Sequence, residues 1–119
     1  MNVDAKVVTI NGVDYVPVGT EVKTISGEHV IVRTYSAGVF FGIIEKREGK
    51  EVKMSVSRRL WYWDGAASLS QLAMSGTSNP SKCQFPEETY GTILTEVIEI
   101  IPCTEQAVKS INGVAIWKK

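Results

Sequence analysis

Residues 39–46 form the segment that most limits the possible folds of this chain, because both faces are apolar when the segment is read as a β-strand. Successive side chains of a strand point to opposite sides of its sheet. The apolar side chains here are Val39, Phe41 and Ile43 on one side and Phe40 and Ile44 on the other. We therefore expect a strand that is central in a sheet or covered on both faces.

Two further strands are predicted beside this segment. Residues 29–35 are rich in β-branched side chains, and apolar residues alternate within residues 51–63. The links Ser36-Ala37-Gly38 and Glu48-Gly49 contain glycines suited to tight turns. The three strands should therefore form an antiparallel meander.

A separate β-hairpin is predicted near the N-terminus, where Asn11-Gly12 lies between residues 7–10 and 13–16. Pro17 cannot donate a ladder hydrogen bond, so it should end the second strand or place it at an edge. We therefore separate residues 1–27, an N-terminal β-hairpin extension, from residues 28–119, a single α+β domain.

The second half is predicted to add helices. Residues 66–75 carry an apolar stripe at helical spacing, Asp64 is a plausible N-cap, and Gly76 is placed to end the helix. Thr104 can cap a second short helix.

The remaining segments are predicted as a loop and two strands. Residues 77–91 contain two prolines and little periodicity, which is typical of an ordered surface loop. Residues 92–101 should form one strand that Pro102 stops, and residues 114–117 a short terminal strand. The predicted fold class is α+β, an antiparallel β-meander with two short helices and a C-terminal strand.

Composition excludes several classes of partner. The chain has 119 residues, and its 13 basic and 13 acidic side chains cancel, so no broad field attracts duplex nucleic acid or an anionic membrane. The apolar runs are too short to span a bilayer, and no signal-peptide region is visible, which predicts a cytoplasmic protein. Cys83 and Cys103 lack a paired ligand motif, so we expect reduced thiols rather than a disulfide or a zinc site.

Catalytic patterns are sparse. The single histidine, His29, has no triad partner in the sequence, and neither a phosphate-binding loop nor metal-ligand spacing is present. Strand and loop carboxylates are more often solvated than paired in space; the candidates here are Asp64, Glu87, Glu88, Glu96, Glu99 and Glu105. We therefore expect a binding protein that is not an enzyme and has no cofactor and no catalytic or metal residues.

The motif Arg58-Arg59-Leu60-Trp61-Tyr62-Trp63 is the strongest candidate for a ligand site. Strand alternation would place Arg59, Trp61 and Trp63 on one face, and Arg58 on the other. Indoles beside a guanidinium suit a ligand that is planar and anionic, such as a nucleotide. The alternative is that these tryptophans build the core or a subunit interface.

A second cation stands beside an aromatic residue at Arg33 and Tyr35, next to a turn whose backbone N–H groups can receive an anion. For Arg33, a cross-strand salt bridge is an equally favoured alternative. Side chains at the start of the first helix also suit phosphate, although Asp64 would compete for the same donors. The predicted ligand-binding residues are Arg33, Tyr35, Ser36, Gly38, Arg58, Arg59, Trp61, Trp63, Ser68 and Gln71.

Three stretches together resemble a widespread family of small phage and prophage proteins of unknown function. They are the segment from Val30 to Val39 that contains RTYSAGV, the segment RRLWYWDGAASLSQLA from Arg58 to Ala73, and LTEVIEIIP from Leu94 to Pro102. The resemblance covers about residues 28–119, and residues 1–27 look like a variable extension. In class, such proteins are similar to viral anti-defence sponges, including anti-CBASS and anti-Thoeris proteins, which bind nucleotide signals as homo-oligomers.

The resemblance implies a phage immune-evasion sponge in the host bacterial cytoplasm. Its ligand would be a cyclic nucleotide signal, either a cyclic oligonucleotide or a cyclic ADP-ribose-type molecule, bound without cleavage. Independently, a small chain with three tryptophans should leave apolar surface that one copy cannot cover, which predicts a homo-oligomer. The alternative function is a structural or protein-binding phage accessory module without a small-molecule ligand.

Overall fold

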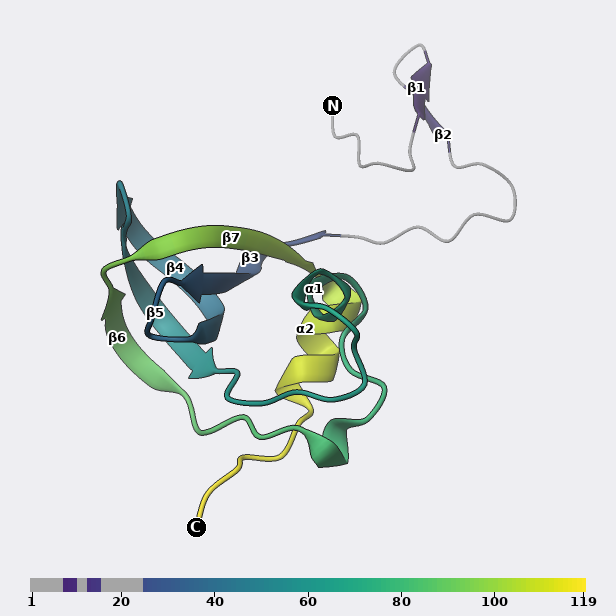
Figure 1. Ribbon diagram of the computed structural model, residues 1–119. Coiled ribbons are helices and arrows are strands. Elements are labelled where there is room, and N and C mark those ends of the chain that lie inside the picture. The colour runs from purple at the N-terminus through teal and green to yellow at the C-terminus, as the bar shows by residue number, and fades with distance from the viewer. Residues whose placement is uncertain (1–7, 11–12, 16–24) are drawn as a thin grey trace.

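The computed structural model describes residues 8–10, 13–15 and 25–119, and its main body is a curled antiparallel sheet with two short helices (Figure 1). Five strands pair in the order β6-β5-β4-β3-β7. They are β3 (Ile25–Thr34), β4 (Val39–Glu48), β5 (Glu51–Arg59), β6 (Thr89–Leu94) and β7 (Val97–Thr104). The two α-helices are α1 (Leu69–Ser75) and α2 (Glu105–Asn112), and the short 3-10 helix η1 (Pro80–Lys82) lies between them in the chain. The α+β class and the predicted meander, β3-β4-β5, are confirmed.

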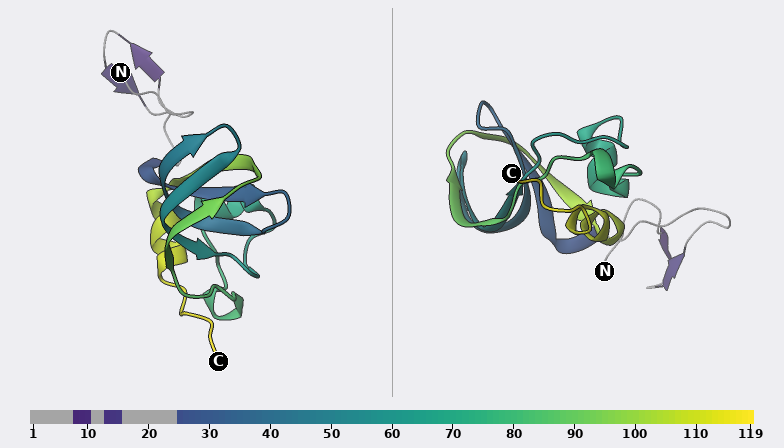
Figure 2. Two further views of the ribbon diagram at one scale, coloured as in Figure 1. Left: turned by 90° about the vertical axis from the view of Figure 1, so that its left-hand side faces the viewer. Right: turned by 90° about the horizontal axis from the view of Figure 1, so that it is seen from below.

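The sheet curls because its two edge strands are consecutive in the chain. A flat sheet would place β6 and β7 about 19 Å apart, four strand spacings. The link from Leu94 to Val97 reaches at most about 11 Å. The edges must therefore approach each other, as the strongly bent sheet in Figure 2 shows, and the Val97 N–H donates to the Lys50 carbonyl at 3.0 Å.

Both faces of the curled sheet are covered by apolar side chains. The first core lies between the sheet and the helices and consists of Ile31, Phe41, Leu60, Leu72, Ala73, Cys83, Phe85, Cys103, Ala107, Ile111 and Val114. The second core lies inside the curl and consists of Val32, Phe40, Val52, Met54, Leu94 and Val97. Phe40 and Phe41 are neighbours on β4 and enter opposite cores, which confirms the prediction of a strand covered on both faces.

The predicted strand over residues 51–63 ends earlier than expected, at Arg59. Beyond it, the Leu60 N–H still donates to the Val39 carbonyl at 2.8 Å, and an isolated bridge between Tyr62 and Gln84 follows. Strand alternation therefore does not extend to the two tryptophans of the motif.

Helix α1 also begins later than predicted, because a different residue caps it. The Ser68 side chain accepts the N–H of Gln71 at 3.1 Å and acts as the N-cap. The predicted cap, Asp64, instead accepts the N–H of its neighbour Gly65. Gly76 ends α1 with φ 77°, as the sequence predicted.

The predicted single strand over residues 92–101 is wrong, because the chain turns after Leu94 and forms two strands at opposite edges. β6 begins at Thr89, inside the segment predicted to be a loop. Pro102 does not stop β7 but pairs opposite Val30 within it. An edge strand has one side free of ladder bonds, so it tolerates a residue without an N–H.

Two further predictions concern the ends of the chain. β1 (Val8–Ile10) pairs antiparallel with β2 (Val13–Tyr15), which confirms the N-terminal hairpin, while its Asn11-Gly12 turn and Pro17 lie outside the described residues. The predicted terminal strand over residues 114–117 is reduced to a parallel bridge between Ile116 and Phe85. Within the described part of the chain, no helix has the length and apolar character needed to cross a membrane.

Candidate functional site

Arg58 lies inside the protein, where its guanidinium binds four backbone carbonyls. Nε donates to Pro86 at 2.9 Å, Nη1 to Ile111 at 3.0 Å, and Nη2 to both Phe85 at 3.0 Å and Val114 at 2.8 Å. The guanidinium also lies 5.5 Å from the centre of the Phe85 ring. We call Arg58 with these four carbonyls the Arg58 carbonyl cluster. It joins β5, the segment before β6, the end of α2 and the residues that follow α2.

The donors of Arg58 are largely occupied by the protein itself. A guanidinium has five N–H groups, and the cluster uses four of them. Burial lowers the pKa of Arg58 below its ordinary value, and the Glu88 carboxylate opposes that shift. This placement favours a structural role over direct contact with an anionic ligand.

The most exposed aromatic group of the motif is Trp61, which stacks with Trp117. Their ring centres are 6.5 Å apart and their planes differ by 10°. Trp61 is 63% exposed and Trp117 is 39% exposed. We call these two side chains the indole pair. Two parallel, accessible indoles form a surface on which a planar molecule can stack.

The structure does not bring Arg59, Trp61 and Trp63 to one face. Trp63 packs against the first core, whereas the Arg59 guanidinium lies 4.5 Å from the centre of the Phe40 ring, in the second core. The prediction of a common face is wrong because β5 ends at Arg59, so the later residues no longer follow strand geometry.

Arg59 and the predicted turn do meet. Nη1 of Arg59 donates to the Ala37 carbonyl at 2.6 Å. A Cβ added at Gly38 would lie 3.7 Å from the same nitrogen, and φ of Gly38 is 111°. Tyr35 and Ser36 are exposed in this turn. Arg59 is therefore held at the turn.

Cations without an ion pair lie beside the indole pair along the chain. Arg59 precedes Trp61 by two residues, and Lys118 and Lys119 follow Trp117. The three ion pairs within residues 25–119 involve none of these side chains. Cations that neighbour stacked aromatics in the sequence suit a ligand with negative charge and a flat ring.

Arg33 forms a salt bridge with a neighbouring strand, which confirms the alternative predicted for it. Its Nε lies 3.0 Å from Oε1 of Glu99, in an ion pair between the adjacent strands β3 and β7. Both side chains are about half exposed. Arg33 therefore has its charge balanced by a neighbour.

Ser68 and Gln71 satisfy the start of α1 rather than an external anion. Ser68 accepts the Gln71 N–H, and Oε1 of Gln71 accepts the Ala67 N–H at 2.9 Å. Two of the N–H groups that were predicted to bind phosphate at this helix start, those of Gln71 and Ala67, are therefore already bonded within the protein.

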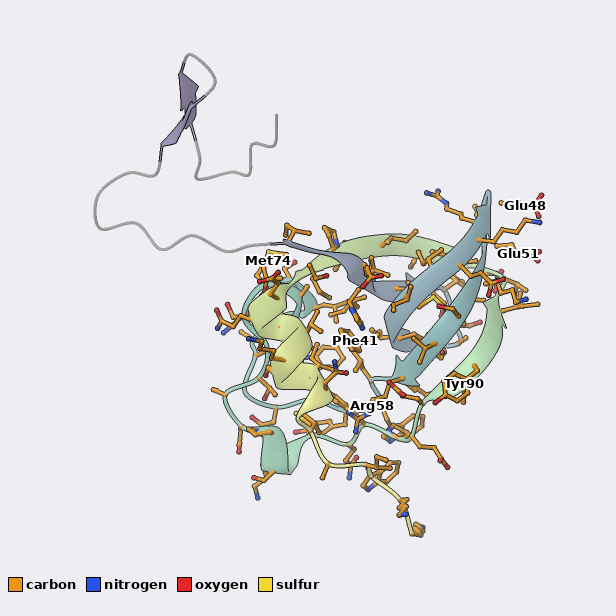
Figure 3. The ribbon with its side chains drawn as sticks, turned by 180° about the vertical axis from the view of Figure 1, so that it is seen from behind. Phe41, Glu48, Glu51, Arg58, Met74 and Tyr90 are labelled. Carbon is orange, nitrogen blue, oxygen red and sulfur yellow. The ribbon has the colours of Figure 1, made fainter. Side chains whose placement is uncertain are left out.

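A cleft of about 530 Å³ lies beside the Arg58 carbonyl cluster. It is lined by Arg58, Glu87, Glu88, Tyr90, Asn112, Val114 and Ile116. Figure 3 shows Arg58 and Tyr90 on the same lower side of the molecule. Because the exposed charges of this cleft are the carboxylates of Glu87 and Glu88, it repels phosphate.

The described residues contain no metal-ligand cluster of three or more histidine, cysteine or acidic side chains. His29 stacks on the Phe41 ring, with centres 5.2 Å apart. Cys83 and Cys103 are free thiols, both buried in the first core.

Sequence reasoning missed Trp117 as a partner of Trp61. The two residues are 56 positions apart, and the segment that carries Trp117 is bonded to Arg58 through the Val114 carbonyl and to the Phe85 carbonyl through the Trp117 N–H at 2.9 Å. In the sequence, the presence of a third tryptophan was the only indication that Trp61 could have an aromatic partner.

A family model matches residues 27–111, and the chain belongs to this family, which is described as a domain of unknown function (DUF6948). The match contains the Arg58 motif, α1 and most of α2. No curated protein and no solved structure matches the chain.

Proposed function

We propose that this protein is a non-enzymatic sponge that binds a nucleotide through the indole pair. The observation that carries the proposal is the pair of parallel, exposed indoles at Trp61 and Trp117, flanked in sequence by the unpaired cations Arg59, Lys118 and Lys119. A base would stack on the indoles, and phosphates would bind the cations. Base–aromatic stacking contributes about 1 to 3 kcal/mol per base, and charge-assisted hydrogen bonds contribute roughly 1.5 to 3 kcal/mol.

The biological setting of the proposal comes from the sequence resemblance to small phage proteins and, in class, to anti-defence sponges. The proposed ligand is accordingly a cyclic nucleotide signal of bacterial immunity, a cyclic oligonucleotide or a cyclic ADP-ribose-type molecule. We also propose that the protein binds this signal without cleaving it. It would do so as a homo-oligomer in the cytoplasm of a host bacterium.

A second candidate function is a protein-binding accessory module, and two observations favour it. Arg33 and Arg58, two of the cations predicted to grip an anion, are engaged within the protein. Large apolar side chains are exposed at the indole pair and at Tyr62, Tyr90, Ile93, Ile98 and Ile116. Such a surface also suits a subunit or partner interface.

A release experiment separates these functions. The protein is incubated with cyclic dinucleotides, cyclic trinucleotides and cyclic ADP-ribose isomers, freed of unbound ligand, and denatured by heat. Chromatography of the released material should recover one intact nucleotide in stoichiometric amount. An altered product that accumulates at substoichiometric protein would instead indicate an enzyme, and the absence of any bound nucleotide would support the protein-binding module.

Calorimetry with the recovered nucleotide then locates the site. Trp61→Ala should weaken binding by about 1 to 3 kcal/mol, as expected for the loss of one stacking wall. Tyr90→Ala is the matched control, because Tyr90 is also a well-exposed aromatic residue, 77% exposed, but lines the acidic cleft instead. A loss of affinity in Tyr90→Ala with none in Trp61→Ala would move the site to the cleft and reject the indole pair.

Light scattering tests the assembly. A homo-oligomer should have a mass that is a multiple of the 13.1 kDa chain. A monomeric mass across micromolar concentrations would reject the homo-oligomer and, with it, a subunit interface built from the exposed apolar side chains.

A further inference from the structure

We infer that Arg58 is a positioning residue that holds Trp117 against Trp61 and thereby sets the affinity of the indole pair for an aromatic ligand. The effect on ligand affinity rests on the proposed function, whereas the positioning of Trp117 by Arg58 does not. Arg58 itself would not contact the ligand, because it is 4% exposed and its donors bind the protein backbone.

A single nitrogen of Arg58 links the segment that carries Trp117 to Phe85, whose neighbour Gln84 bridges to Tyr62, the residue after Trp61. Nη2 donates both to Val114, which begins segment 114–117, and to Phe85. The same Phe85 carbonyl accepts the N–H of Trp117 at 2.9 Å. Arg58 therefore fixes the start of segment 114–117 and also orients the acceptor that binds its end.

Packing alone does not fix the path of this segment. Val114 is buried in the first core, but the three following residues, Ala115, Ile116 and Trp117, are all exposed. Few apolar contacts therefore constrain the chain after Val114, and its polar contacts decide where the Trp117 indole lies.

The geometry requires arginine rather than any cation. The four carbonyls come from three separate parts of the chain, and the planar guanidinium reaches them with donors in fixed directions. A lysine has the same charge but three donors at one point. Arg58→Lys should keep the charge and lose most of the cluster.

The first experiment measures the indole pair without a ligand. Closely spaced parallel indoles couple their electronic transitions and give a paired positive and negative band in circular dichroism. Trp117→Ala defines the spectrum without this coupling, and Arg58→Lys should approach that spectrum while its unfolding stays cooperative. Arg33→Lys is the matched control, since it makes the same change at an exposed ion pair, and it should keep the coupled bands.

A measurement on the unaltered protein covers the case in which Arg58→Lys does not fold. The backbone N–H of Trp117 should exchange with solvent about as slowly as the hydrogen-bonded amides of α2, because the cluster holds it on Phe85. Exchange as fast as that of an unstructured amide would overturn the inference.

The second experiment measures binding by calorimetry, with cyclic di-AMP, cyclic GMP–AMP and cyclic ADP-ribose as probes. For any probe that binds, Arg58→Lys should weaken affinity by about 5- to 150-fold, the loss expected when one stacking partner is misplaced, and Arg33→Lys should change it little. Equal affinity in Arg58→Lys, or coupled indole bands that survive that substitution, would overturn the inference and leave the proposed function standing. Lost bands in Arg58→Lys with no probe bound by the parent would support the positioning of Trp117 and reject these nucleotides as ligands.

Discussion

Gly42 is the position at which a single added methyl group should damage the fold most. It is buried near the middle of β4, between Val30 of β3 and Ser57 of β5. A Cβ at this position would overlap the carbonyl oxygen of Val56 and lie 2.8 Å from the Cα of Ser57. Both obstacles are backbone atoms of a central strand, so no side chain can rotate to make room.

The expected loss in free energy of unfolding follows from how far β5 must move to make room for the methyl group. Carbon atoms in contact are normally about 3.5 to 4.0 Å apart, so β5 would have to shift by roughly 1 Å. Such a shift weakens the neighbouring ladder bonds, each contributing about 0.5 to 1.5 kcal/mol, and strains two packed cores, which typically costs about 1 to 3 kcal/mol. We therefore expect Gly42→Ala to lower the free energy of unfolding by about 3 kcal/mol or more.

Urea unfolding followed by circular dichroism measures this loss, and Gly49→Ala is the matched control. Gly49 has φ 61° and open space around it, so alanine there meets only backbone strain, about 1 to 2 kcal/mol. Thermal unfolding should show the same order, with a decrease of roughly 10 to 25 °C for Gly42→Ala. A Gly42→Ala protein that is no less stable than Gly49→Ala would refute the close approach of β4 and β5.

Three further predictions test other parts of the fold. Thr104→Val should lower the free energy of unfolding by about 2 to 3 kcal/mol in urea titrations, because the buried hydroxyl caps α2 and donates to the Met74 carbonyl at 2.8 Å; an unchanged midpoint would contradict both contacts. Burial raises the pKa of the Cys103 thiol from 9.0 to about 12, so its contribution to stability is complete below pH 9 and is lost as the pH rises toward 12. The urea midpoint should therefore fall more steeply above pH 9 than that of Cys103→Ala, and parallel curves would count against this assignment. Arg33→Ala should cost no more than about 1 kcal/mol, measured in the same way, because its ion pair with Glu99 is half exposed; a loss of several kcal/mol would mean that the pair is structurally essential.

The centre of the sheet was predicted correctly because its structure follows from local rules of side-chain alternation and turn geometry. The two apolar faces of β4 follow from side-chain alternation, and the turns at Gly38 and Gly49 follow from glycine geometry; both have positive φ. The same rules failed at Pro102, where a local helix and strand breaker is accepted because β7 is an edge strand. Whether a strand lies at the edge of a sheet depends on the pairing of all the strands, so it cannot be predicted from the residues around Pro102 alone.

The candidate site was less predictable because its contacts join distant parts of the chain. Alternation within the motif correctly paired Arg58 with Leu60, and both are buried. Nothing near Arg58 in sequence identifies its carbonyl acceptors, which lie 27 to 56 residues away. The stacking of Trp61 on Trp117 is likewise a contact between residues far apart in the chain. Side-chain chemistry thus indicated the aromatic surface, and tertiary structure selected which residues form it.

The pairing of the first main strand with the last has a consequence for synthesis on the ribosome. β3 needs β7 as its second neighbour, and the pair Val30 and Pro102 is separated by more than half of the chain. Val97 contributes to the second core and Ile111 to the first, so both cores stay incomplete until β7 and α2 have been translated. A nascent chain stalled after β6 should therefore expose apolar side chains on both faces of β4 and bind chaperones, and this domain should fold only after translation of α2 is complete.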